Sequence, residues 1–304
     1  MINKQEKLTK VKLKGNESFN IREGWLRKGM RCVQEYPTLF SRDDAMEILG
    51  VGSKMVKSIR YWLRATGLTE ERAPSGKARE QVLTEKFGTI VEQYDKYFDD
   101  IFTLFLVHYH VVKDEENLCV AWNVFFNDYD GQDFTKENMI EKCKEELNKR
   151  LAEGVTFSDS SFADDCSSIL RMYNATDVSE DPEESLGCPI VELGLIRRST
   201  NKKGTYVKTS PSREALDKLA VLYVMLDNIG EGKDSVSIDA LINEPNNIGK
   251  VFNLDRVLIN EYLDQLRVSG YITLNRTAGL DMVYINTDRT PQGIMREYYE
   301  KRMR

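Results

Sequence analysis

The tract that decides the fold is SRDDAMEILGVGSKMVKSIRYWLRATGL, residues 41–68. Ser41, with acidic residues after it, has the character of a helix N-cap, and the triplet Gly50-Val51-Gly52 interrupts the helical pattern. Ser53 begins a second helical pattern as its N-cap, and Gly67 ends it. Two short helices joined by a glycine-containing turn are the outline of a helix-turn-helix.

The second helix of this tract has two chemically distinct faces. At 100° per residue, one arc collects the apolar side chains Met55, Val56, Ile59, Trp62 and Leu63. A cationic face opposite it suits the major groove of DNA, although lysine and arginine also cover the solvent face of many soluble helices. The candidate DNA contacts are Ser53, Lys54, Lys57, Arg60, Tyr61 and Arg64.

The surroundings of the tract extend it to a winged-helix-like, DNA-contacting domain over residues 15–95, preceded by a basic arm over residues 1–14. After a loop with Pro74 and Gly76, the weakly alternating tract QVLTEKFGTIVEQ favours the hairpin that follows a recognition helix. Residues 1–80 carry 17 Lys and Arg against 10 Asp and Glu, whereas the remaining chain carries 26 against 39. A polyanionic partner is therefore expected at the N-terminal quarter.

Residues 96–211 predict a helical middle module. A polar stretch over residues 174–184 leads into CPIVELGLI, which is short, apolar and expected to be buried. Thr135 and Ser158 are expected as N-caps of two helices. The helical patterns cover residues 101–112, 118–126, 136–151 and 160–173.

Residues 212–304 return to the winged-helix order with a different sequence. Helical patterns over 212–226, 235–242 and 254–268 precede two short strands, and a helix over 292–302 closes the chain. Because the helix over 254–268 is slightly acidic, we expect this unit to bind a protein partner or form a homodimer. The expected fold class is mainly α with short β-hairpins, with winged-helix-like N- and C-terminal units flanking the helical middle module.

The composition of the 304 residues, 41% hydrophobic and 30% charged, is that of a soluble globular protein. No apolar run reaches the roughly 18 residues of a transmembrane helix, and no export signal is visible. Five widely spaced cysteines without a CxxC pair predict structural thiols, of which Cys166 and Cys188 are expected to be buried, and a cytoplasmic location. Walker A, GxGxxG, HExxH and GxSxG motifs are missing, so neither zinc nor a nucleotide cofactor is predicted.

Candidate catalytic side chains are few. His108 and His110 lie in one apolar segment, where the ordinary interpretation is a hydrogen-bonded core histidine. Carboxylates are the alternative, because two or three of them can hold Mg²⁺ or Mn²⁺ beside a phosphodiester. Asp95 and Asp99 are one helical turn apart in YDKYFDD, although Asp99 and Asp100 also suit the start of the following helix. The catalytic candidates are Glu17, Asp95, Asp99 and His108.

Several motifs carry a family resemblance over about residues 14–286: GNESFNIREGWLRKG, LGVGSKMVKSIRYW, TLFLVHYH with AWNVFFND, LGCPIVELGLI, and SVSIDALI with TAGLDMVY. Together they resemble an uncharacterised prokaryotic family found beside DNA phosphorothioation genes, whose best-known kind is the SspB-like subunit of the single-strand phosphorothioation system. In the first motif Asn16 stands where the family commonly has histidine. Positions that match the family are Gly15, Glu17, Ser18, Phe19, His108, Trp122, Phe125, Phe126 and Asn127.

The resemblance implies a DNA-nicking and DNA-engaging component of a bacterial anti-phage modification system. The partners it implies are double-stranded DNA, a cysteine desulfurase, an adenylating sulfur-transfer protein and an ATPase. Family resemblance favours a nickase that depends on a divalent metal such as Mg²⁺ or Mn²⁺. The lack of a nuclease motif favours instead a non-catalytic winged-helix DNA-binding adaptor or transcriptional regulator.

Overall fold

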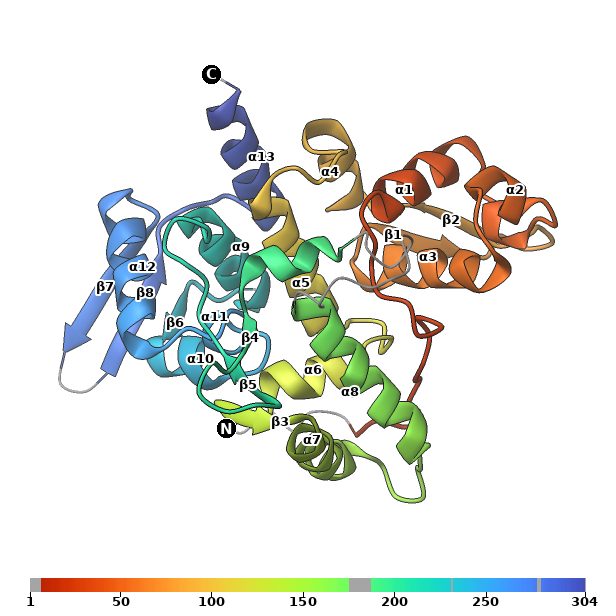
Figure 1. The fold of residues 1–304 in the computed structure, drawn as a ribbon. Helices are drawn as coiled ribbons and strands as arrows, with labels where there is room; N and C mark the ends of the chain where they lie inside the picture. Colours follow the sequence, from red (N-terminus) through yellow and green to blue (C-terminus); the bar gives the residue numbers. More distant parts are fainter. Residues whose placement is uncertain (1–6, 175–186, 231, 278–279, 304) are drawn as a thin grey trace.

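The computed structural model describes residues 7–174, 187–230, 232–277 and 280–303. The chain is mainly α-helical with short antiparallel strands, as the sequence predicts (Figure 1). The turn at Gly279, most of the polar stretch over 174–184 and the first six residues of the basic arm lie outside the described residues. Among those described, no helix combines the length and apolar character that a membrane span requires.

The N-terminal unit has helices followed by a hairpin. Gly50, with φ 60°, ends the first helix of the expected helix-turn-helix. Ser53 is not the N-cap of the second helix but its first residue, and Gly52 occupies the N-cap position. Ser41 is not an N-cap: it ends a 3-10 turn, and Asp44 precedes the helix instead. The elements are α1 Trp25–Glu35, η1 Leu39–Ser41, α2 Ala45–Leu49, α3 Ser53–Ala65, β1 Thr69–Arg72, β2 Glu80–Leu83 and α4 Gly88–Tyr94.

The hairpin of this unit lies on both sides of the Pro74/Gly76 loop, with Thr69 paired to Leu83 and Arg72 to Glu80. The sequence placed it wholly after the loop, but the second half of that tract forms α4. The hydroxyl oxygen of Thr84 accepts a hydrogen bond from Gly88 N at 2.8 Å, which turns the chain into the helix. A side chain at Gly88 would place its Cβ 2.0 Å from the carbonyl oxygen of Leu68, so this close approach requires glycine.

Trp62 joins the N-terminal unit to the rest of the molecule. Its side chain is fully buried, and its Nε1 donates to the carbonyl oxygen of Phe19 at 2.9 Å. Its ring meets that of Trp122 edge to face, with centroids 5.6 Å apart. The tryptophan therefore fixes both the N-terminal segment and the helix that contains Trp122, Val120–Asn127, against α3.

Trp62→Ala is expected to lower the free energy of unfolding by about 3–5 kcal/mol, because it removes a large buried side chain and leaves a cavity. Urea denaturation followed by circular dichroism measures the change. Trp62→Phe, which retains most of the volume, is the control and should cost much less. A Trp62→Ala protein within about 1 kcal/mol of the wild type would contradict this account of the junction.

The middle module confirms the expected helices and adds a sheet. Thr135 and Ser158 cap their helices by accepting from Asn138 N and Ser161 N. The apolar tract after Cys188 is buried, as expected. β3, β5 and β4 form an antiparallel sheet in that order, which was not expected. The elements are α5 Ile101–Lys113, α6 Val120–Asn127, β3 Asp133–Thr135, α7 Lys136–Arg150, α8 Asp159–Tyr173, η2 Pro189–Leu193, β4 Ile196–Arg198 and β5 Thr205–Lys208.

The C-terminal unit also has helices followed by a hairpin, with β6 added to the hairpin in the sheet order β6-β8-β7. Its last helix returns to the junction of the N-terminal unit and the middle module, where Tyr298 stacks on Phe102 and Tyr299 on Tyr94. The elements are α9 Lys218–Asn228, β6 Ser235–Ser237, α10 Ile238–Asn243, α11 Ile248–Val251, α12 Arg256–Val268, β7 Ile272–Thr277, β8 Leu280–Ile285 and α13 Pro291–Arg302.

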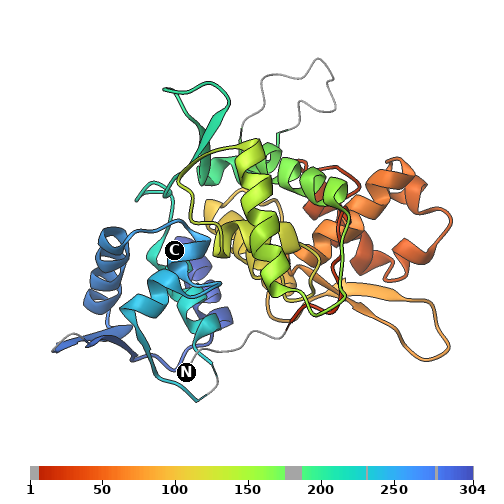
Figure 2. The same cartoon turned by 90° about the horizontal axis from the view of Figure 1, so that it is seen from below.

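The cores of these units are continuous. Helix α5 lies at the centre of the molecule (Figure 1), and every residue from Phe102 to Tyr109 is buried. The described part of the basic arm packs across the middle module: Leu8 exchanges backbone hydrogen bonds with Arg150 and Ala152 after α7. The β4–β5 hairpin, in contrast, projects from the body of the molecule (Figure 2).

Candidate nucleic-acid interface

The candidate DNA contacts of α3, apart from Tyr61, divide into two groups. Ser53, Lys54 and Lys57 are exposed, and we call them the α3 cationic end. Arg60 and Arg64 instead bind Glu71 of β1, with their guanidinium nitrogens 2.6 and 3.0 Å from its Oε1. The carboxylate neutralises part of their charge, so the surface best suited to a polyanion is the N-terminal half of the helix.

Tyr61 does not lie on the exposed face that the helical pattern predicted. Its side chain is only 9% exposed, and its hydroxyl donates to the carbonyl oxygen of Leu118 at 2.9 Å. The pattern assumed one buried face, whereas α3 packs against α1 on one side and against the start of α6 on another. This burial raises the pKa of Tyr61 well above its usual value and leaves little of the side chain for contact with DNA.

The segment Lys14–Phe19 forms an unusual turn beside the α3 cationic end. Lys14, Glu17 and Ser18 have φ values of 57°, 50° and 67°, in the region that favours glycine. Each such residue costs roughly 1–3 kcal/mol, so the surroundings must hold the turn in place. Asp165 of α8 does so by accepting from Lys14 N at 3.1 and 3.2 Å. Strain of this kind gathers at functional sites.

Two side chains of this turn carry functional groups suited to a binding or catalytic site. The Glu17 carboxylate, 31% exposed, lies 3.7 Å from the ammonium nitrogen of Lys57. Asn16 is 2% exposed, and its Oδ1 accepts from Ser18 N, while its Nδ2 has no hydrogen-bond partner among the described residues. Burial raises the pKa of the nearby Asp165 to about 6. A carboxylate and a buried amide thus meet the cationic end of α3.

Asp95 and Asp99 do not share a helical face, because α4 ends at Tyr94. The buried carboxylate of Asp95 accepts from Asp99 N at 3.0 Å, from Asp100 N at 3.2 Å and from the hydroxyl of Thr103. Asp99 is exposed in the connecting loop, and Asp100 caps α5 by accepting from Phe102 N. The helix-start interpretation therefore describes Asp100, and Asp95 holds the loop together.

His108 is a core histidine. It is fully buried, with Nε2 2.8 Å from the carbonyl oxygen of Val251 and Nδ1 2.7 Å from the hydroxyl of Tyr173. Since a carbonyl only accepts, Nε2 carries the proton and Nδ1 accepts from the tyrosine. Burial lowers the pKa of His108 to about 4. Because the His108 side chain is fully buried, it is not accessible to a substrate.

This lowered pKa predicts a loss of stability in mild acid. Below pH 6.5 the unfolded chain binds a proton at His108 that the folded chain does not, so stability falls between pH 6.5 and about 4. From pH 7 to pH 5 the histidine should cost about 2 kcal/mol. The raised pKa of Asp165 acts in the opposite direction, so the informative quantity is the difference between wild type and His108→Gln in urea denaturation. Equal pH dependence of the two proteins would contradict the assignment.

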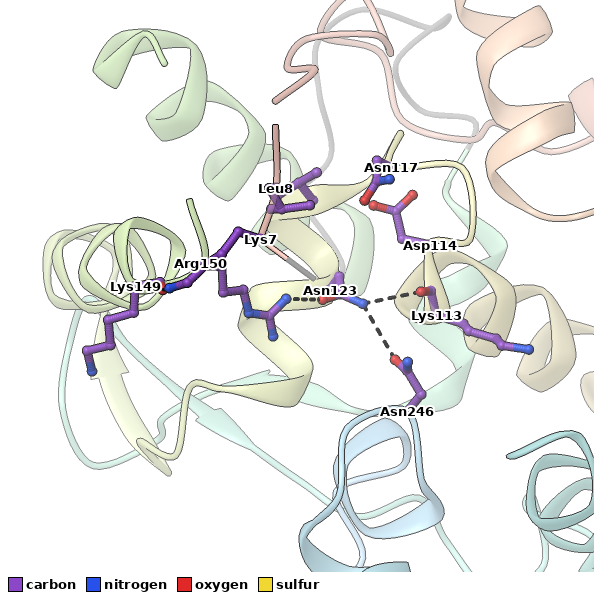
Figure 3. A pocket seen from close by; sticks show the side chains of 10 residues that line it. Lys7, Leu8, Lys113, Asp114, Asn117, Asn123, Lys149, Arg150 and Asn246 are labelled. Atoms are coloured by element: carbon purple, nitrogen blue, oxygen red, sulfur yellow. Dashed lines mark hydrogen bonds between the residues drawn. The ribbon is translucent and has the colours of Figure 1, made fainter. Parts of the chain in front are cut away.

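A separate cavity of about 400 Å³ is lined by polar side chains, several of which already hydrogen-bond to other groups of the protein (Figure 3). Asn123 is the centre of this lining: its Oδ1 accepts from Arg150, and its Nδ2 donates to the carbonyl oxygen of Val112 and to Asn246. Lys113 donates to Asp227 at 2.7 Å. These contacts join α5, α6 and the loop after α10, so the cavity is explained as a structural junction.

The candidate metal-ligating side chains are dispersed. Across the described part of the chain, no three side chains from His, Cys, Asp and Glu are grouped so that they could hold a metal ion. Cys166 is buried, as expected, and Cys188 is half-buried. Sequence reasoning missed Glu71, which pairs the α3 arginines, and Asp165, which holds the strained turn. Neither belongs to a local motif: Glu71 meets the arginines only because β1 folds back along α3, and Asp165 acts on Lys14, 151 residues away in the sequence.

Comparison with known proteins gives one family and closely similar folds. The family model "Protein of unknown function (DUF4007)" matches residues 13–299. No curated protein matches the chain. The chain is similar to "Magnesium ion-bound SspB crystal structure", with 25% identity, a TM-score of 0.82 and coverage of 97% of this chain and 88% of that chain. It is similar also to "SspB crystal structure", with 25% identity, a TM-score of 0.81 and coverage of 97% and 89%.

Proposed function

The chain belongs to the DUF4007 family, and from this membership and its similarity to SspB we propose that it is the DNA-engaging component of a bacterial DNA phosphorothioation system. The similarity to SspB extends over nearly the whole chain. This extent supports a function common to the two proteins rather than the sharing of a single domain. The proposed partners are double-stranded DNA, a cysteine desulfurase, an adenylating sulfur-transfer protein and an ATPase. A homodimer through the C-terminal unit is part of the same proposal.

The observation that carries DNA engagement is the α3 cationic end. We interpret α2 and α3 as a helix-turn-helix; α3 precedes the β1–β2 hairpin, and this order is compatible with a winged helix. In such motifs the N-terminal residues of the second helix enter the major groove. Lys54 and Lys57 occupy that position and are exposed. We extend the winged-helix interpretation to the C-terminal unit, where the β7–β8 hairpin follows α12 as the β1–β2 hairpin follows α3.

The finer proposal is that the chain nicks one DNA strand at the Lys14–Phe19 turn. Of the four catalytic candidates, Glu17 is the one that lies beside the α3 cationic end. The residues present fit a divalent cation in part: Glu17 offers one carboxylate, and Mg²⁺ commonly uses one or two carboxylates together with water and substrate phosphate. When bound, such a cation would stabilise charge on the phosphodiester. Lys57 would hold the phosphate at the turn.

A non-catalytic DNA-binding adaptor or regulator is the second candidate. Asp95 is held by hydrogen bonds within its loop and His108 is buried, so of the catalytic candidates only Glu17 and Asp99 are accessible. This favours the adaptor. The dispersal of metal-ligating side chains in the described residues also favours it. Both candidates require DNA binding, so they differ only in strand cleavage.

The test is a pair of assays on highly purified protein. Duplex binding is measured by fluorescence anisotropy, and conversion of supercoiled plasmid to open circle is measured with Mg²⁺, with Mn²⁺ and with excess EDTA. We expect duplex binding together with cation-dependent nicking. Binding without nicking would replace the nickase by the adaptor. The absence of duplex binding at low salt would overturn the proposed function.

A further inference from the structure

We propose that the β4–β5 hairpin is a second DNA contact, which grips the phosphate backbone independently of α3. This inference rests on the proposed function and concerns the acidic part of the chain, where the charge balance predicts no polyanion contact. The sequence IRRSTNKKGTYVK, residues 196–208, is an exception to that balance. No Asp or Glu occurs between Glu192 and Glu214, while Arg197, Arg198, Lys202 and Lys203 are all exposed.

The hairpin has a firmly held base. β5 pairs with β3 on one edge and with β4 on the other, and the ring of Tyr206 stacks on that of Phe134. The ammonium group of Lys208 donates to the carbonyl oxygens of Phe125 at 2.8 Å and of Tyr129 at 2.6 Å, at the end of α6. Burial lowers the pKa of Lys208 to about 7, so its contribution to the base is the pair of hydrogen bonds rather than a full positive charge. The base is thus anchored in the middle module.

The tip projects from this base into solvent (Figure 2). Ser199 N donates to Thr205 O at 2.8 Å, which closes the end of the strand pair, and Gly204, with φ 76°, completes the turn. The base of such a hairpin is rigid. Less conformational entropy is therefore lost when its cations bind a ligand.

A hollow of about 300 Å³ lies on the hairpin, and its lining matches a phosphate group. The donors around it are guanidinium, ammonium, hydroxyl and amide groups, the types that contact DNA phosphates. Asp133 is the one carboxylate among the described residues of this lining. The principal donors are Arg197, Arg198, Ser199, Thr200, Asn201 and Lys202.

The chemistry of the tip favours a phosphate backbone over a membrane or an apolar groove. Residues 199–204, STNKKG, contain no large apolar side chain that could insert into lipid or between bases. The hairpin and the N-terminal unit lie in different parts of the molecule (Figure 2). The two surfaces would therefore bind different phosphates, and their effects on affinity should add.

The test compares duplex binding by wild type and by Lys202→Glu combined with Lys203→Glu over a range of salt concentrations. Each lost phosphate contact lowers the slope of log K against log salt by about 0.9, so we expect the slope to fall by up to about 2 and the affinity roughly tenfold or more. Lys202→Arg combined with Lys203→Arg should bind like wild type. The matched control is Arg296→Glu combined with Lys301→Glu on α13, which changes the net charge equally and should bind nearly as wild type.

The outcomes separate this inference from the proposed function. If the folded hairpin variant keeps the wild-type slope while wild type binds duplex, the hairpin inference fails alone. An equal loss in the α13 control would also overturn it, because net charge would then explain the effect. Binding of phosphatidylserine vesicles in preference to duplex would assign the hairpin to a lipid surface. If wild type binds no duplex, the proposed function fails first.

Discussion

Lys54→Glu combined with Lys57→Glu is expected to remove most of the duplex affinity that we propose for this protein. Both side chains are exposed at the start of α3, where a helix-turn-helix meets the groove. A charge-assisted hydrogen bond contributes about 1.5–3 kcal/mol, so two lost contacts should weaken binding by roughly 100-fold or more. The slope of log K against log salt should fall by about 2.

The control for this prediction is Arg60→Gln combined with Arg64→Gln, compared also with Lys54→Gln combined with Lys57→Gln, which removes the same charge. The α3 pattern places these arginines among the DNA contacts, but their guanidinium groups bind Glu71. Replacement of the arginines should therefore alter the salt slope less than replacement of the two lysines does. Fluorescence anisotropy over a range of salt concentrations measures all three variants. Wild-type affinity in the lysine variants, with loss of affinity in the arginine variant, would reverse the assignment.

Glu17→Ala is expected to abolish most cation-dependent nicking. A metal ion contributes several kcal/mol of charge stabilisation to phosphodiester cleavage, so loss of a ligand should lower the rate roughly 10²-fold or more. The carboxylate lies next to Lys57 and in a strained turn, which is a poor place for a merely solubilising residue. Plasmid relaxation per folded molecule is the measurement.

Two other carboxylates serve as controls for the nicking assay. Asp95→Asn should lower stability by about 1–3 kcal/mol, because Asp95 accepts three hydrogen bonds in a buried loop. Its nicking per folded molecule should be nearly intact, and so should that of Asp99→Ala. Undiminished nicking by Glu17→Ala, or full activity in excess EDTA, would contradict the assignment of Glu17 and point to another nucleophile or to a contaminating nuclease.

Helices of the middle module could be predicted because their signals are local. Thr135 and Ser158 bond to residues three positions later, so the cap and the helix start can be recognised in one short tract. The sheet of β3, β5 and β4 has no such signal. β3 is three residues long, and its partner strand begins seventy residues later. Pairing across that distance depends on the packing of α7 and α8, which no short pattern encodes.

In the candidate site, too, the features that depend on local sequence could be predicted, and those that depend on long-range packing could not. The position of Lys54 and Lys57 on one helix follows from a period of 3.6 residues, and it is found in the structure. The burial of Tyr61 does not follow, because it arises from the contact of α3 with Leu118 and Cys119, which lie in the loop just before α6 and more than fifty residues away in the sequence. Asp95 and Asp99 looked adjacent only while the helix was assumed to continue. The end of α4 at Tyr94 separates them.

The most direct test of DNA engagement through α3 is site-specific photocrosslinking. A photoreactive residue at position 53, the first residue of α3, is compared with one at position 296 on α13, which is also exposed. The account predicts that position 53 crosslinks to duplex DNA at low salt, loses the crosslink when Lys54 and Lys57 are reversed, and that position 296 does not crosslink. Crosslinking at position 296 with none at position 53, in a protein that binds duplex, would contradict it.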